Sequence, residues 1–480
     1  MLSIIDPAAA LASLVALPGA FPGAAAAAFD ALPGVSAAES AVQAAGDVLT
    51  RLRGLLGLGV LALCAWALSS NRKRIPWRVV IWGLVLQFVF ALIILRTPAG
   101  RVVFDVANDA VLAVVGYTLE GAQFLFGDLV WNNVPVGIGD PGNGGFVAEG
   151  QQVARTGAFV AFNVLPTIIF FASLMTLLYH LGVMQKVVGG IAWVMQRTMG
   201  TSGAETLTVA GNIFIGQTEA PLLVKPFVDG MTRSELMTVM TGGFATVAGG
   251  VMAAYVGMLA GVFPEIAGHL MAASVMSAPA AMLVAKLMLP EEETPATAGK
   301  LQTNIEKPDV NVIEAAARGA GEGMKLALNV GGMLLAFLAM IALLNGILGW
   351  VGGLFGAEWI SLEWILGWLL APVAWVMGVP WAEAPQVGSL MGLKTVATEF
   401  VAYLGLAEVM AGDGLSERSA AIAAYALSGF ANFASIAIQI GGIGGIAPRR
   451  RRDLAQLGLR AMIGGSIAAF MTAAIAGVLI

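Results

Sequence analysis

The chain has 480 residues, of which 58 % are hydrophobic and only 11 % are Asp, Glu, Lys or Arg. Soluble domains carry about 25 % charged residues, so these few charges exclude a set of water-soluble globules and predict a polytopic membrane protein. The net charge of −5 argues against a nucleic-acid partner, and one cysteine with two histidines leaves no Cys/His cluster for zinc.

The N-terminal residues 1–50 form the first distinct segment. They are rich in Ala and Gly, and roughly the first 46 contain neither Lys nor Arg. A secretory signal has a basic region at its start. We therefore expect an extracytoplasmic N-terminal extension rather than a cleaved signal.

Apolar windows close to the length of about 20 residues that a membrane-crossing helix needs recur along the rest of the chain. The sequence predicts about eight transmembrane helices from them: Gly54–Asn71, Val79–Leu95, Thr156–Gln185, Leu236–Pro264, Ile266–Ala285, Leu326–Ala357, Ser419–Pro448 and Ala461–Ile480. The segment Arg101–Gly127 is also apolar, but Asp105, Asp109 and Glu120 interrupt it. We expect it to be an amphipathic helix on the outer interface.

The distribution of Lys and Arg predicts the orientation of these helices. If the eight windows alternate and the N-terminus lies outside, 18 of the 25 Lys and Arg residues fall on the inner side. The positive-inside rule therefore favours a multi-pass protein of the cytoplasmic (inner) cell membrane with both termini extracytoplasmic. The polar stretch Glu291–Asp309 is then a cytoplasmic linker between two halves.

Two apolar stretches are too interrupted to be simple spans. Thr206–Val224 contains Glu219, and Trp364–Leu406 contains Glu383, Lys394 and Glu399, each near Gly or Pro. A carboxylate at mid-membrane costs at least about 2.5–3.5 kcal/mol, and non-helical backbone at that depth must be buried in protein or line a cavity. The pattern predicts two re-entrant hairpins that form a transport site, with Lys394 pairing with a carboxylate or reaching the interface.

The two halves also echo each other. Thr218-Glu219 precedes Gly243-Phe244-Ala245-Thr246, and Thr398-Glu399 precedes Gly429-Phe430-Ala431-Asn432. In the topology above, the first hairpin enters from inside and the second from outside. The sequence thus predicts an all-α fold containing an inverted repeat.

Longer motifs in the same places make the chain resemble the concentrative nucleoside transporters. The resemblance extends from about Gly54 to the C-terminus and rests on these runs: Gly216–Leu223 (GQTEAPLL), Glu399–Tyr403 (EFVAY), Gly429–Phe433 (GFANF) with Ser435, Phe162–Pro166 (FNVLP) and Ser277–Pro279. It implies a homotrimer whose scaffold stays fixed while transport domains move, and alternating-access import of nucleosides coupled to Na⁺ or, in some bacterial members, to H⁺.

On this basis the chain divides into six segments. They are the N-terminal extension (1–50), N-terminal spans and interfacial helices that are mostly scaffold (51–200), a first transport half with hairpin 1 (201–290), the cytoplasmic linker (291–320), a scaffold span (321–360) and a second transport half with hairpin 2 (361–480).

A nucleoside is neutral and carries a base edge of donors and acceptors as well as ribose hydroxyls, so its site needs amides, hydroxyls and carboxylates beside an apolar wall. The resemblance assigns Gln217, Thr218 and Glu219 to the nucleobase, with Val251 as an apolar contact. It assigns Glu399, Asn432 and Ser435 to the sugar, with Phe430 packing nearby. A carboxylate is well suited to accept the ribose hydroxyls, because charge-assisted hydrogen bonds are the stronger ones.

The coupling ion is expected at oxygen ligands, because Na⁺ prefers carbonyls, amides and hydroxyls at unwound helices. Positions matching the family's Na⁺ site hold the side chains of Asn212 and Thr246 and the carbonyls of Ile215 and Val247. Asn212 favours Na⁺ over H⁺, and no cofactor is expected besides this ion.

Two other hypotheses remain at this stage, an H⁺-coupled symporter of the same fold and a nucleoside-permeable channel. An intramembrane enzyme has no support, because the chain lacks a Gly-x-Ser-x-Gly elbow and a His-Glu-x-x-His motif.

Overall fold

The computed structural model of the chain describes residues 35–131, 133–139, 146–155, 160–299, 309–412 and 414–480. Residues divide into two compact units, 1–52 and 53–480. Helix α3 begins at Val35 and ends at Ala67, so the end of the expected extension, residues 35–50, is helical. The remainder of that extension lies outside the described residues.

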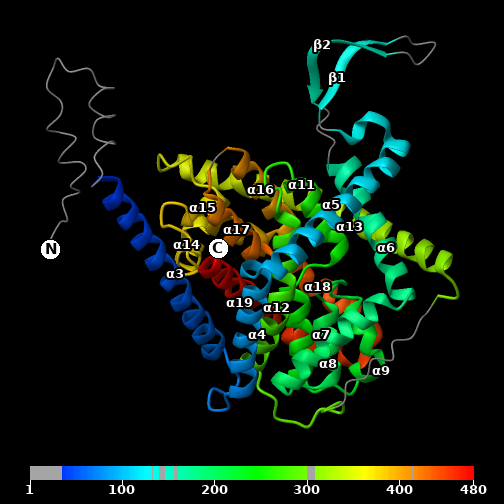
Figure 1. Ribbon diagram of the computed structural model, residues 1–480, viewed down its shortest axis with the longest axis vertical. Helices are drawn as coiled ribbons and strands as arrows, with labels where there is room; N and C mark the ends of the chain where they lie inside the picture. The colour runs from blue at the N-terminus through cyan, green and yellow to red at the C-terminus, as the bar shows by residue number, and fades with distance from the viewer. Residues whose placement is uncertain (1–34, 132, 140–145, 156–159, 300–308, 413) are drawn as a thin grey trace. The chain divides into compact units, whose positions relative to one another are not determined.

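The second unit consists mainly of helices (Figure 1). In chain order they are α4 (Trp77–Arg96), α5 (Pro98–Phe126), η1 (Gly127–Val130), η2 (Val160–Val164), α6 (Leu165–His180), α7 (Val183–Met199), α8 (Gly203–Gly211), η3 (Ala220–Val224), α9 (Lys225–Val228), α10 (Arg233–Ala245), α11 (Gly249–Leu259), α12 (Ile266–Met288), α13 (Val312–Gly353), α14 (Leu362–Val376), α15 (Ala384–Val396), α16 (Glu399–Ala411), α17 (Glu417–Leu427), α18 (Phe433–Ile446), η4 (Pro448–Arg450) and α19 (Arg451–Leu479).

Among the described residues, seven helical stretches are long and apolar enough to cross a membrane. Six match predicted windows; they contain α4, α6, α10–α11, α12, α13 and α19. The predicted window Ser419–Pro448 is not a continuous helix, because it is divided between α17 and α18. The window Gly54–Asn71 lies largely in α3, which ends at Ala67.

The seventh stretch contains α5, the segment that we expect on the interface. Its carboxylates Asp105, Asp109 and Glu120 are all exposed, and their spacing places them on one side of the helix. The helix therefore has the amphipathic pattern expected, yet it is also long enough to span. Its interfacial position stays a prediction.

The predicted helical multi-span fold is confirmed, and one small element outside the spans adds to it. Strands β1 (Asn133–Gly139) and β2 (Phe146–Arg155) pair antiparallel, with Val134 opposite Ala154 and Ile138 opposite Val147. The intervening sequence Asp140–Gly145 (DPGNGG) is rich in the residues that favour hairpin turns. The hairpin lies between the predicted apolar windows, so a search for membrane spans does not detect it.

The interior of the unit is made by helices from both halves of the chain. The most apolar windows of α10–α11 and α12 are 94 % and 89 % buried, whereas that of α13 is only 22 % buried. Helix α19 packs against α10, α12 and α17, and α12, α17 and α19 lie near the middle of the unit in Figure 1. Helices α4, α5, α6 and α13 therefore form its periphery.

Two helical stretches of this interior are interrupted, one in each half of the chain. Helix α10 ends at Ala245 and α11 begins at Gly249, while α17 ends at Leu427 and α18 begins at Phe433. The two interruptions touch at Gly429, which has φ of 102° and where a Cβ atom would lie 2.5 Å from the carbonyl oxygen of Phe244. Only glycine allows this backbone conformation and close approach at low cost. The crossing therefore places four helix ends inside the protein.

Candidate functional site

A pocket lined by residues from both halves of the chain lies beside this crossing. Its lining brings together all eight residues that the sequence analysis assigns to the nucleoside: Gln217, Thr218, Glu219, Val251, Glu399, Phe430, Asn432 and Ser435. They come from the segment between α8 and η3, from α11, from the start of α16, and from the segment between α17 and α18 with the first turn of α18. Residues separated by more than 200 positions in the sequence thus meet in one cavity.

Glu399 is held at the start of helix α16. The hydroxyl of Tyr255 donates to Oε1 at 2.8 Å, and the amide nitrogen of Asn432 donates to Oε2 at 2.7 Å. The side chain lies in the first turn of a helix capped by Thr398, where the helix dipole favours a negative charge. Each carboxylate oxygen can accept a further hydrogen bond. The pocket therefore offers a fixed acceptor pair suited to two neighbouring hydroxyls.

Asn432 and Ser435 form one structural unit. Asn432 is the N-cap residue of α18, and its Oδ1 accepts a hydrogen bond of 2.8 Å from the backbone nitrogen of Ser435. Because this cap occupies Oδ1, the amide nitrogen of Asn432 must point to Glu399. Both residues are 2 % exposed, so this part of the site is shielded from bulk water.

The opposite part of the pocket holds Gln217, Thr218 and Glu219. The amide nitrogen of Gln439 donates to Oε1 of Gln217 at 2.9 Å and also to the carbonyl of Met240. Thr218 donates to Oε1 of Glu219 at 3.0 Å. The Gln217 amide nitrogen and the Glu219 carboxylate thus place a donor and an acceptor on one side of the pocket, as recognition of a nucleobase edge requires.

An apolar wall completes the pocket. Val251 and Phe430 contribute to it as expected, and helix α13 adds Leu326, Val330 and Met333. Sequence reasoning did not identify these three, because apolar residues in a long apolar helix carry no positional signal. Their presence means that the pocket is closed on one side by a helix distant in sequence from both interruptions.

Two buried polar residues that hold the site in place were also missed. Tyr255 and Gln439 are both 0 % exposed, and they support Glu399 and Gln217 respectively. The ring of Tyr255 packs against Tyr403 with centroids 4.4 Å apart. The sequence does contain a signal for them: each is a polar side chain in an otherwise apolar span, and a buried polar side chain requires a hydrogen-bond partner.

The four residues expected at the coupling ion lie next to the pocket. Asn212 and Ile215 follow the end of α8, while Thr246 and Val247 follow the end of α10, and the two helices pack against each other. Asn212 is 1 % exposed, yet neither its Oδ1 nor its Nδ2 has a hydrogen-bond partner in the structure. A buried amide without a partner costs free energy, so this side chain fits an oxygen-binding cation.

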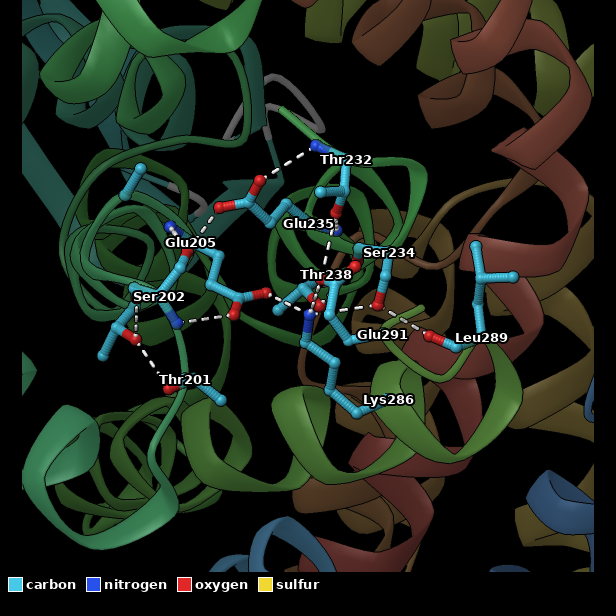
Figure 2. Close-up of polar contacts among 12 residues, drawn as sticks. Thr201, Ser202, Glu205, Thr232, Ser234, Glu235, Thr238, Lys286, Leu289 and Glu291 are labelled. Carbon is cyan, nitrogen blue, oxygen red and sulfur yellow. Dashed lines mark hydrogen bonds and ion pairs between the residues drawn. The ribbon is translucent and has the colours of Figure 1, made fainter. Parts of the chain in front are cut away.

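The opposite ends of the same two helices are joined by a network of charged groups (Figure 2). Lys286 of α12 lies 2.8 Å from Oε2 of Glu205 and 3.0 Å from Oε2 of Glu291. Ser202, the N-cap residue of α8, donates to Glu235 in the first turn of α10. The network fixes α8 and α10 to α12, and hence fixes the positions of Asn212 and Thr246 at their other ends.

Comparisons with known protein families match most of the chain. Models described as "Na+ dependent nucleoside transporter" C-terminus and N-terminus match residues 269–477 and 56–129, and a "Nucleoside recognition" gate model matches 161–262. An uncharacterized transporter of Haemophilus influenzae is 46 % identical over 433 residues, covering 89 % of this chain and 98 % of the relative. The sodium/nucleoside cotransporter 1 of Mus musculus is 40 % identical, and the match covers 89 % of this chain and 64 % of that longer relative.

Solved structures are similar along nearly the whole chain. The structure of CNTnw in an inward-facing, substrate-bound state is 43 % identical, with a TM-score of 0.79 and coverage of 90 % of this chain and 98 % of that one. An outward-facing CNTnw variant gives a TM-score of 0.78, with the same identity and coverage of 89 % and 97 %. The chain therefore belongs to the concentrative nucleoside transporter family, a family of multi-pass membrane transporters rather than enzymes.

Proposed function

We propose that this protein is a Na⁺-coupled nucleoside symporter that imports nucleosides across the cytoplasmic membrane by alternating access. The observation that carries the proposal is the pocket itself. It is lined by Glu399, by the Gln217 amide and Glu219 carboxylate, and by apolar side chains. Inward-facing and outward-facing structures are known for the similar protein CNTnw, which supports a mechanism with two access states.

In this proposal Glu399 accepts the ribose hydroxyls, assisted by Asn432 and Ser435. Gln217, Thr218 and Glu219 bind the nucleobase edge, and the ring lies against Val251 and Phe430. The direct hydrogen bonds of Tyr255 and Asn432 to Glu399 reduce the reorganisation needed on binding, and such preorganisation raises affinity.

Na⁺ is bound by the side chains of Asn212 and Thr246 and by the carbonyls of Ile215 and Val247. The unpartnered amide of Asn212 supports this assignment. Bound Na⁺ would hold the segment after α8, which contains Gln217–Glu219, against the end of α10. Na⁺ and nucleoside must then strengthen each other's binding by the same factor.

The fold that we propose contains an inverted repeat. Helices α6–α12 and α13–α19 follow the same order: a span, a peripheral helix, a pair of short segments, an interrupted span and a final long helix. The short pairs, α8 with η3–α9 and α15 with α16, are the two re-entrant hairpins. The Gly-Phe-Ala echoes are not in register with this repeat, because residues 243–245 end α10 whereas residues 429–431 follow the end of α17.

We further propose the homotrimer, the six segments and the extracytoplasmic termini given in the sequence analysis. In each protomer, the outer helices would form the scaffold and the interior helices the transport domain. Cross-linking of single-cysteine variants in membrane vesicles tests the trimer and the topology separately.

Competition of unlabelled nucleosides against labelled uridine in proteoliposomes tests the function. Nucleosides are expected to compete only when Na⁺ is present, at neutral pH. Competition that is equally strong at acid pH with choline replacing Na⁺ would instead indicate the H⁺-coupled alternative.

A further inference from the structure

A buried lysine, Lys394, lies at the interruption between α17 and α18. Lys394, in the last turn of α15, is 1 % exposed. Its Nζ donates to the carbonyl of Ala426 at 2.9 Å and to that of Ser428 at 3.2 Å. Among the described residues, no carboxylate lies within 4.0 Å of this ammonium, so the expectation that Lys394 pairs directly with a carboxylate or reaches the interface is wrong.

The two carbonyls belong to the C-terminal end of α17, where helix α17 stops at Leu427. The last carbonyls of a helix have no partner within the helix and carry the negative end of its dipole. They therefore bind a cation well. The Glu399 carboxylate adds a longer-range attraction to the same ammonium.

This arrangement corresponds to the proposed Na⁺ site of the first half. There, the end of a short helix (α8) meets the interrupted end of a second helix (α10), and Asn212 and Thr246 lie at the junction. In the second half, the end of α15 meets the interrupted end of α17 in the same order along the chain. The first junction has an unpartnered amide, whereas the second already contains an ammonium.

We propose that Lys394 is a built-in cation that takes, in the second half, the place that Na⁺ takes in the first. This inference rests on the proposed Na⁺ site and extends it. Lys394 is a positioning residue: it holds α15 to the end of α17, and so holds Glu399 and the α17–α18 interruption in the arrangement that binds the sugar. Because the second junction is permanently filled, one Na⁺ suffices for each nucleoside.

The first test is the ratio of fluxes in the unmodified protein. Proteoliposomes with an inward Na⁺ gradient are supplied with ²²Na⁺ and tritiated uridine, and the nucleoside-dependent Na⁺ influx is compared with uridine influx. A ratio of one Na⁺ per uridine is expected, and a ratio of two overturns the proposal. Absence of any uridine-dependent Na⁺ influx would instead contradict the proposed function, so the two failures are distinguishable.

The second test uses Lys394→Met, with Thr395→Val on the same helix as a matched control. At saturating Na⁺, we expect uridine binding by purified Lys394→Met to be at least tenfold weaker, while binding of 2′,3′-dideoxyuridine changes less than threefold. The concentration of Na⁺ that half-maximally raises the melting temperature without nucleoside should change less than twofold. Uridine affinity within twofold of the unmodified protein, or equal losses for both nucleosides, would refute the positioning role. If the variant does not fold, the flux ratio decides alone.

Discussion

The role of Glu399 gives the sharpest prediction about substrate recognition. In Glu399→Gln the side chain keeps its shape but has one acceptor oxygen and one amide nitrogen. The amide nitrogen of the new glutamine cannot face Asn432, because Asn432 directs its own amide nitrogen, a donor, at residue 399. The Oδ1 atom of Asn432 is occupied by the cap of α18. The glutamine nitrogen must therefore face Tyr255, whose hydroxyl can rotate to accept.

The expected loss follows from the kind of hydrogen bond removed. A hydrogen bond to a charged group contributes about 1.5–3 kcal/mol and one between neutral groups about 0.5–1.5 kcal/mol. When the hydrogen bonds of both ribose hydroxyls change from a charged to a neutral acceptor, the binding free energy weakens by about 2–3 kcal/mol in total. This is a decrease of about 30- to 150-fold in affinity. The fold should tolerate the change, because both existing contacts of residue 399 can be retained.

Titration calorimetry on purified protein at saturating Na⁺ measures this effect. Uridine and 2′,3′-dideoxyuridine are each titrated into the unmodified protein and Glu399→Gln. The loss should be confined to uridine, because the dideoxy compound has neither hydroxyl. Equal losses for the two ligands, or a large fall in melting temperature, would show that Glu399 supports the fold instead of recognising the sugar.

Three further predictions concern the surrounding groups. Asn212→Leu should raise the Na⁺ concentration for half-maximal uridine uptake at least tenfold, because it fills the proposed ion site with an apolar side chain; an unchanged Na⁺ dependence would exclude Asn212 as a ligand. Lys286→Met should lower the midpoint of thermal unfolding markedly, because removing one partner of a buried ion pair costs about 3–5 kcal/mol; adding Glu205→Gln should recover part of the loss, and no recovery would argue against the pairing. Gln439→Met should weaken nucleoside binding several-fold without altering Na⁺-induced stabilisation, since it frees Gln217; calorimetry that finds unchanged affinity would refute this support.

The sequence indicated where a site should lie, because polar and charged residues stand in places where lipid or apolar packing would otherwise be found; the assignment of individual residues to the nucleoside came from the resemblance of their motifs and stays a prediction. Glu219 and Glu399 could be recognised as intramembrane carboxylates beside glycine and proline, and Asn432 and Ser435 belong to the same long motifs. The eight predicted residues lie in one pocket. A charged group in an apolar segment must have a partner or a cavity, so its position in the sequence already indicates a site.

The parts that sequence did not predict depend on tertiary contacts. Leu326 and Met333 line the pocket only because α13 passes beside it, and nothing in their identity distinguishes them from residues facing lipid. The window 419–448 has no charged residue and reads as one span, yet it is interrupted between α17 and α18 where Gly429 crosses the end of α10. The strands β1 and β2 are short and mix polar with apolar residues, so a search for long apolar windows does not detect them.

The most direct test of Na⁺-coupled nucleoside import is accumulation of labelled uridine in proteoliposomes that begin with equal uridine on both sides. With an inward Na⁺ gradient, the internal concentration should rise above the external one and fall back when the gradient is collapsed. Equal accumulation with choline in place of Na⁺, or equilibration without accumulation, would contradict the account.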